Sequence, residues 1–274
     1  MDLTRNTRPE RFRLNASHPL AQGLVFAGLG NNPGSERYYD SSVYQRHGTG
    51  IFASTGARSG IKIGRQMLLL RGHTADDYIT LPNAPATSGG GFTFSCWYLS
   101  TDTDADNQYV VSVTGSTDNR LNITDTQCVF EYADSMETST AYTNADDGTL
   151  VHFAYFRPPF GTTVYFYKNG QLADSQYNTG LGGVFTFDRI GINGYGADEF
   201  DGYIGDIVLH DRALSLSEIQ TLADPSNIML DGLIKPAYTT SFGRISTQVS
   251  LSTIPISNYL NVFKSPIFNS LMYR

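Results

Sequence analysis

The sequence has few of the residues on which several protein classes depend. Its 274 residues include two cysteines and one tryptophan, and only 16% are charged. Two cysteines are too few for a disulfide scaffold or a cysteine-based zinc module, and we expect Cys96 and Cys128 to be free, buried thiols. No apolar run approaches the roughly 20 residues that span a membrane, so we expect no membrane insertion. The charged first 15 residues have no apolar core and do not match a secretory signal.

Charge is unevenly distributed along the chain. The net charge is −7, with −11 on the first 231 residues and +4 on the last 43, which argues against nucleic acid as a partner. Residues 98–150 contain ten acids and one base, Arg120. This middle segment is either a solvated acidic rim or a cation site. The basic tail is either solvated surface or a docking segment.

Short apolar runs between Gly, Asp, Asn and Pro predict about a dozen strands. Residues 92–98 alternate at period two but are apolar on both faces toward the end, which is typical of a strand buried on two sides. Asn169-Gly170 supplies the two positive-φ positions of a type I′ hairpin. One helix is predicted after Ser215, because Glu218 completes a capping box, and Pro225 ends it. These features predict an all-β, antiparallel two-sheet jelly-roll sandwich with one short C-terminal helix.

The two ends of the chain differ from its middle. We expect an N-terminal arm over residues 1–22, one sandwich over 23–223 and a C-terminal extended arm over 224–274. The C-terminal arm carries scattered apolar side chains that we expect to anchor it to a partner: Ile254, Ile256, Tyr259, Leu260, Phe263 and Phe268. The alternative is a strand that folds back on its own domain. An extended arm can reach about 130 Å, so we expect a homo-oligomer, with a trimer as the working stoichiometry.

Four motifs, in chain order, resemble those of LamG-like, concanavalin A-type jelly rolls. The sequence reads FTFSCW at 92–97, VHFA at 151–154, YFYKNGQL at 165–172 and FDGYIGDIVLHDRALSLSEI at 200–219. They are similar to that family's F-T-hydrophobic-S-x-W and W-H-H-V-A strands, its L-Y-V-N-G-x-L hairpin, and its closing strand and helix. The resemblance covers roughly residues 23–223 and implies a concanavalin A-like sandwich.

A narrower resemblance concerns the start of this region. SHPLAQGLV at 17–25 resembles the opening of LamG-like proteins encoded by tailed bacteriophages, and YDSS at 39–42 with HGT at 47–49 resembles another of their elements. It implies a virion protein, either capsid decoration or a head or tail fibre. Its expected partners are other virion proteins, and its expected location is the virion, assembled in the host cytoplasm.

The resemblance also directs attention to carboxylates and calcium. Related glucanases pair carboxylates on one strand, whereas Glu131, Asp134 and Glu137 are spaced so that Asp134 points away from Glu131, so we expect no catalytic residues. LamG-like domains often hold calcium at the sandwich rim. The candidate oxygen donors are Asp102, Asp104 and Asp106, with Asp40 and Asp206. The family's aspartate after the Ile of the last strand is Gly205 here. A calcium site and an empty acidic loop both remain open, and no other cofactor is expected.

Three function classes follow. The prediction is a non-enzymatic virion structural protein that displays a lectin-like sandwich and is anchored by its arms. The alternative is a carbohydrate-binding adhesion module that reads host or environmental glycans through exposed aromatic side chains, with Tyr109, Tyr142 and Tyr195 as candidates. A glycoside hydrolase is disfavoured because no catalytic set is visible.

Overall fold

A computed structural model describes residues 12–29, 37–52, 59–62, 65–71, 76–101, 107–132, 135–141, 148–160, 162–177, 183–225 and 234–236. All of these residues belong to one compact unit. The expected anchor residues between 254 and 268 lie outside them, so the anchoring role of the C-terminal arm stays a prediction. None of the helices in the described ranges is long and apolar enough to cross a membrane.

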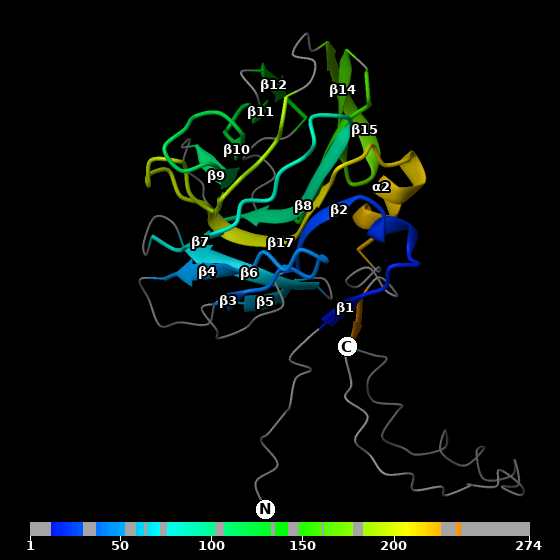
Figure 1. The fold of residues 1–274 in the computed structure, drawn as a ribbon. Helices are drawn as coiled ribbons and strands as arrows, with labels where there is room; N and C mark the ends of the chain where they lie inside the picture. Colours follow the sequence, from blue (N-terminus) through cyan, green and yellow to red (C-terminus); the bar gives the residue numbers. More distant parts are fainter. Residues whose placement is uncertain are drawn as a thin grey trace, which may run out of the picture. The chain divides into compact units, whose positions relative to one another are not determined.

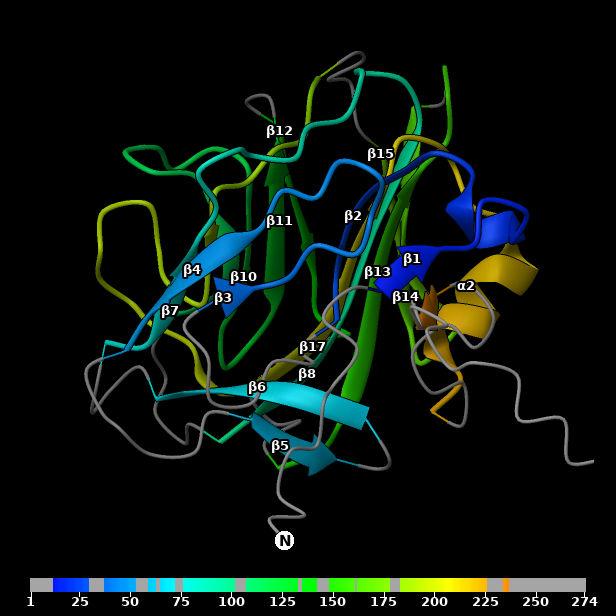
Figure 2. The same cartoon turned by 60° about the horizontal axis from the view of Figure 1, so that its bottom comes forward.

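Two eight-stranded sheets face each other (Figures 1 and 2), and every strand pairing between described residues is antiparallel. In order across the sheet, sheet I contains β12 (Ser135–Ser139), β11 (Cys128–Tyr132), β10 (Arg120–Ile123), β9 (Gln108–Ser112), β16 (Arg189–Ile190), β7 (Tyr78–Thr80), β4 (Gly48–Ile51) and β3 (Arg37–Tyr38). Sheet II contains β15 (Gln171–Tyr177), β14 (Thr163–Lys168), β13 (Val151–Arg157), β8 (Phe92–Ser100), β17 (Asp201–His210), β6 (Arg65–Arg71) and β5 (Ser59–Lys62), and β2 (Leu24–Gly28) also pairs with β17. The predicted sandwich is confirmed.

An aromatic core fills the space between the two sheets. Phe92 and Phe94 of β8 meet Phe130 of β11, and Phe130 stacks on Tyr155 with 4.0 Å between ring centroids. Phe92 also stacks on Phe185, with rings 3° from parallel. Such ring pairs add about 1 kcal/mol each beyond the free energy of burying their area. This packing explains why period-two alternation on these strands predicts the layer correctly.

A second apolar layer covers the outer face of sheet II. It contains Leu20, Leu24, Ala27, Leu29, Ala154, Val208, Leu214, Ile219 and Leu222. Helix α2 (Leu216–Ala223) supplies part of this layer and begins with the predicted capping box, in which Ser215 Oγ accepts from Glu218 N. Trp97 Nε1 donates to the carbonyl of Leu222 at 3.1 Å, which satisfies an acceptor at the helix end. β8 is therefore buried on both faces, as its sequence predicts.

The hairpin between β14 and β15 also matches its local sequence. Asn169 and Gly170 have φ values of 52° and 76°, and Lys168 pairs with Gln171 across the turn. At this site the positive φ of Gly170 is easily adopted because glycine has no Cβ. The predicted two-residue turn is confirmed.

The terminal segments of the described chain pair with each other. β1 (Phe12–Leu14) runs antiparallel to β18 (Ile234–Pro236), with residue 12 opposite residue 236. The 3₁₀ turn η1 (Pro19–Ala21) follows β1, and Leu20 is buried in the outer apolar layer. Residues 18–22, which the sequence places in the N-terminal arm, thus lie against the sandwich, because Leu20 finds apolar partners there.

Candidate functional site: a pocket at the rim of sheet I

Glu131 and Glu137, the nearest approach to a glucanase pair, lie on opposite faces of sheet I. Glu131 is the direct cross-strand partner of Met136, which is 60% exposed, whereas Glu137 is buried opposite the core residue Phe130. Direct cross-strand partners project from the same face of a sheet, so one carboxylate points outward and the other inward. Their spacing predicts positions on one strand, but the two glutamates lie on two strands, β11 and β12. Asp134 lies outside the described residues.

Asp40, a candidate calcium ligand, is used by the fold. Its Oδ1 accepts from Ala27 N at 2.9 Å and from Ser42 N at 2.8 Å. Its Oδ2 accepts from Ser42 Oγ at 2.7 Å and from Arg46 N at 2.8 Å. With 2% of its surface exposed, this carboxylate joins β2 to the β3–β4 loop. Its oxygens are already engaged, which disfavours Asp40 as a metal ligand.

Asp206, another candidate calcium ligand, lies at an irregularity in β17. Its φ is 45° and the pairing of β17 with β8 shifts between Gly205 and Val208. Burial raises the pKa of Tyr38, and the nearby charges of Asp206 and Asp40 raise it further. Within the described ranges no three His, Cys, Asp or Glu side chains form a group that could hold a metal. Asp102, Asp104 and Asp106 lie outside those ranges, so calcium at that loop stays a prediction.

The three candidate glycan-binding tyrosines fall in different places. Tyr109 is 8% exposed, and its hydroxyl accepts from Arg120 Nη1 at 3.0 Å, so its ring does not form an open platform. Tyr109 is buried because it lies on the interior strand β9, where the Arg120 side chain of the neighbouring strand β10 lies over its ring. Tyr142 lies outside the described residues. Tyr195 is 68% exposed, in the turn after β16.

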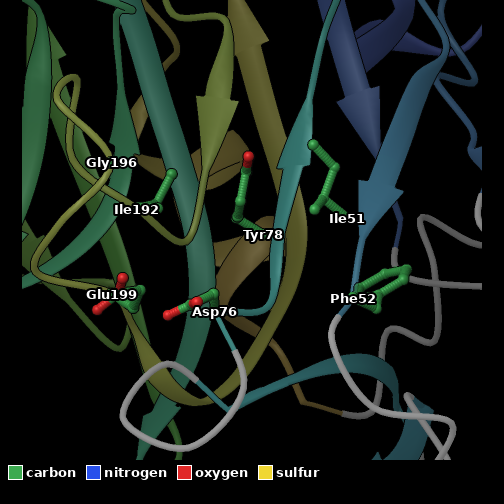
Figure 3. Close-up of a pocket in the computed structure, with 7 residues that line it drawn as sticks. All are labelled: Ile51, Phe52, Asp76, Tyr78, Ile192, Gly196 and Glu199. Carbon is green, nitrogen blue, oxygen red and sulfur yellow. The ribbon is translucent and has the colours of Figure 1, made fainter.

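A pocket of about 370 Å³ opens beside this turn (Figure 3). Its lining residues are Ile51, Phe52, Asp76, Tyr78, Ile192, Gly196 and Glu199. Ile51 and Tyr78 are direct cross-strand partners at the ends of β4 and β7. The pocket therefore combines apolar and aromatic walls with two carboxyl groups, although its residues are spread over some 150 positions of the sequence.

The turn that forms one wall of the pocket is held by Asn193. Its Oδ1 accepts from Tyr195 N and Ala197 N, both at 2.9 Å, and its Nδ2 donates to Asp198 Oδ2 at 3.0 Å. Gly196 has a φ of 82°, which favours glycine at this position. These bonds join residues of the turn to one another, so the wall is preorganised.

Arg189 fixes a second wall of the pocket. Its guanidinium carbon lies 5.8 Å from the centroid of the Tyr78 ring. Its Nε donates to Thr114 Oγ1 at 3.0 Å and its Nη1 to the Asn193 carbonyl at 3.3 Å. One arginine thus links the ring in the pocket to the adjoining turn. A wall held in place in this way loses little conformational entropy when a ligand binds.

Comparison with known families assigns the fold. Residues 73–220, more than half of the chain, match the family described as the concanavalin A-like lectin/glucanases superfamily. The chain belongs to this superfamily. A comparison with curated proteins finds no match.

Solved structures share this concanavalin A-like fold at low sequence identity. The binding domain of Paraclostridial Mosquitocidal Protein 1 aligns with a TM-score of 0.57 and 17% identity, over 76% of this chain and 53% of that one. Domain 4 of AbnA, an extracellular arabinanase from Geobacillus stearothermophilus solved with arabinotriose, aligns with a TM-score of 0.52 and 17% identity, over 78% of this chain and 100% of that domain. The botulinum neurotoxin serotype D ligand-binding domain, solved with N-acetylneuraminic acid, aligns with a TM-score of 0.53 and 14% identity, over 74% of this chain and 51% of that one. The chain thus spans about half of the first and third. At these identities the likeness shows the fold alone, a lectin-like jelly roll.

The SHPLAQGLV segment has a structural role in this lectin-like domain. His18 is the N-cap of η1, and its Nδ1 accepts from Leu20 N. Arg212 reaches across from the end of β17, donating through Nε to Gln22 O at 2.7 Å and through Nη2 to Pro19 O at 3.0 Å. The same guanidinium pairs with both carboxylate oxygens of Glu218, which lowers the pKa of Glu218 to about 2. This clasp joins the opening motif to the closing helix.

None of the residues that line the pocket is a candidate from the sequence. Tyr195, which is one, lies in the adjacent turn, but Asp76, Tyr78 and Glu199 carry no signal. These residues lie at strand ends and in connections, where no periodic pattern marks them. Only the pairing of β7 with β4 on one side and with β16 on the other brings them together.

Proposed function

We propose that the chain is a non-enzymatic, lectin-like binding protein displayed on the particle of a tailed phage, and that its rim pocket binds a saccharide. The observation that carries the binding role is the pocket itself, with an aromatic ring and two carboxyl groups on preorganised walls. The virion role rests on the phage-like opening motif.

A saccharide suits the chemistry of this pocket. Sugar rings present apolar C–H faces and a rim of hydroxyl groups. Ile51 and Tyr78 offer apolar surface for the former, and Asp76 and Glu199 offer hydrogen-bond acceptors for the latter. Binding sites for small molecules commonly combine apolar walls with a few fixed polar groups in this way.

Hydrolysis is less well supported than binding. Retaining and inverting glycosidases need two carboxyl groups that flank one bond, whereas Glu131 and Glu137 project from opposite faces of sheet I. The relatives with similar folds are mainly binding domains. A binding role without turnover is therefore the function that the geometry favours.

The virion role is supported by the resemblance of SHPLAQGLV to the opening of phage-encoded proteins, and the pairing of β1 with β18 is compatible with it. This pairing brings the segments that lead to both tails to one two-stranded ribbon, which suits a domain held at one base and displayed outward. We propose other virion proteins as partners of the tails, in a homo-oligomer. We also propose calcium as an optional ligand of the 102–106 loop, which isothermal titration with calcium would test.

The glycan part is tested on a glycan array, followed by titration of the best hit. Tyr78→Ala and Asp76→Asn should each weaken binding by about tenfold, or 1.4 kcal/mol. Matched controls are Tyr177→Ala, an exposed tyrosine of sheet II, and Asp125→Asn, an exposed aspartate in the turn after β10. They should leave affinity unchanged. Absence of any glycan hit, or equal losses in the controls, would contradict the pocket assignment.

The virion part is tested separately, by immunogold imaging and mass spectrometry of purified particles from the phage that encodes the chain. The expected result is a fixed copy number per particle at one location on the head or tail. If the chain occurs in the infected cell but not in purified particles, this part of the proposal fails, whatever the glycan array shows.

A further inference from the structure

The outer face of β13, β14 and β15 in sheet II is apolar. Ala154 of β13 belongs to the outer apolar layer, and its direct cross-strand partner on β14 is Tyr167. Direct partners project from the same face, so the register places four further side chains on it: Phe156, Tyr165, Leu172 and Tyr177. We call these aromatic and leucine side chains, together with Phe160 in the turn from β13 to β14, the aromatic patch.

Every Asp, Glu, Lys and Arg of these three strands projects from the opposite face. They are Arg157, Lys168 and Asp174, whose direct cross-strand partners are the core residues Phe92, Phe153 and Phe166. An antiparallel sheet with one solvated face normally places its polar side chains on that face. The arrangement is reversed here, and uncharged apolar surface of this kind marks a contact with a partner.

The aromatic patch is only partly covered by its own chain. Phe156 and Tyr167 pack against the outer apolar layer, whereas Leu172 and Tyr177 are 57% and 72% exposed. Phe160 is 99% exposed and has a φ of 61°, which is rare for a residue other than glycine. Backbone strain of this kind is concentrated at functional positions, so the turn that carries Phe160 is part of the candidate contact.

Helix α2 covers the adjoining part of the same face. Trp97 of β8 donates to the carbonyl of Leu222, and a Cβ on Gly170, in the β14–β15 turn, would lie 3.1 Å from the Cβ of Ala223. The helix therefore lies beside one end of the β14–β15 hairpin (Figure 1). Tyr177 is at the opposite end of β15, so the aromatic patch continues the outer apolar layer past the helix.

The rings of the aromatic patch suit a protein partner better than a sugar or a lipid surface. Phe156 meets Tyr165 at 51° and Tyr167 at 88°, with centroids 5.6 and 6.5 Å apart. Rings packed at such angles present edges as well as faces, whereas a sugar stacks on one open ring face. An anionic lipid surface attracts Lys and Arg, and these three strands present neither on this face. Tyrosine is enriched at the energetic centres of protein interfaces.

We infer that the aromatic patch packs against the same patch on a second copy of this chain. Two uncharged faces meet without burying an unpaired charge. Each copy has a net charge of −7, so two copies approach with the least local repulsion where neither presents a charge. The contact is isologous and joins two copies, so it predicts a dimer and not a trimer. It names a surface for the proposed homo-oligomer and rests on that part of the proposed function, whereas saccharide binding does not depend on it.

Sedimentation equilibrium of the full chain tests the contact. Three strands from each copy form an interface at the small end of the usual range, so we expect a dissociation constant of about 10–100 µM. The double variant Phe160→Asn, Tyr177→Ser should weaken the dimer at least about tenfold, because each substitution occurs on both sides of the contact. Asparagine tolerates a positive φ, so the turn keeps its conformation. Tyr44→Ser and Met136→Ser, at positions 56% and 60% exposed outside the patch, are matched controls and should dimerise like the unaltered chain.

The salt dependence separates apolar association from charge pairing. Raising the salt concentration to about 0.5 M screens the repulsion between two negatively charged copies, so the dimer should tighten or stay unchanged. A dimer that weakens about fivefold or more would show that opposite charges hold the copies together, and the inference would be wrong.

Thermal unfolding verifies that each variant is folded. If the double variant does not fold, Leu172→Ser carries the same test with a smaller effect. If the full chain stays monomeric at every concentration, the proposed homo-oligomer and this inference both fail. If the chain dimerises but the patch variants dimerise equally well, or if only removal of residues 237–274 abolishes the dimer, this inference alone is overturned.

Discussion

Lowering the pH from 7 to 5 should destabilise the protein through one buried histidine. His210, 1% exposed, lies with Nε2 2.8 Å from the carbonyl oxygen of Leu20. A carbonyl only accepts, so Nε2 carries the proton. Nδ1 is buried with no hydrogen-bond partner among the described residues. Protonating Nδ1 would place an uncompensated charge beside the outer apolar layer, and burial therefore lowers the pKa of His210 to about 4.

The size of the effect follows from this pKa. As the pH falls below about 6.5, the unfolded chain takes up a proton at this histidine, while the folded protein does not until the pH nears 4. Stability is thus lost between these two values, by about 2 kcal/mol between pH 7 and pH 5. Glu218 affects the pH dependence of stability only at lower pH. Its pKa is lowered to about 2, so its contribution is lost only below the ordinary value of 4.5.

The measurement is urea unfolding at pH 7 and pH 5, for the unaltered protein and for His210→Gln. The glutamine variant keeps an N–H donor but does not titrate, so its free energy of unfolding should change by about 2 kcal/mol less between the two pH values. His47→Gln is the control. The pKa of His47 is also lowered, but this side chain is only partly buried, so the substitution should reduce the pH dependence of the free energy of unfolding less than His210→Gln does. The reasoning is refuted if His210→Gln keeps the full pH dependence, or if NMR shows His210 titrating near 6.5 in the folded protein.

Three further predictions concern the clasp, the core and the tail. Arg212→Lys should lower the free energy of unfolding by about 2 kcal/mol in urea titration, because lysine cannot make the bidentate pair and both carbonyl bonds; Arg37→Lys, at an exposed position of β3, should change it little. Gly28→Ala should cost about 1–3 kcal/mol, since its Cβ would collide with the side chain of Tyr38, and adding Tyr38→Phe should restore part of it. Deleting residues 236–274 should leave the sandwich folded in circular dichroism but prevent particle incorporation, with little rescue at low salt, and full occupancy of the truncated chain would contradict this.

Several elements of the fold could be predicted because their cause is local. A positive-φ pair at 169–170 makes the β14–β15 turn, and the Ser215–Glu218 capping box begins α2. Alternation with apolar residues on both faces marks β8 as a doubly covered strand. In each case the residues that decide the structure are within a few positions of one another, so the sequence alone determines the element.

The candidate site could not be predicted in this way. Tyr109 is on a strand rich in apolar residues, and its burial beside Arg120 of β10 depends on how the strands pair. Glu131 and Glu137 are six positions apart in an acidic segment, but the chain reverses between them, and the β11–β12 register puts them on opposite faces. Spacing along the chain does not determine the face once a turn intervenes.

The sequence by itself determined the class of fold, the strand periodicity, the helix start and the uneven charge. The tertiary structure alone decided which distant groups meet. Ile51 and Glu199 line one pocket, and His210 bonds to a carbonyl 190 residues away. The physical reason is that backbone preference and burial pattern act over a few residues, whereas a binding site depends on the order in which strands pair across the sheet.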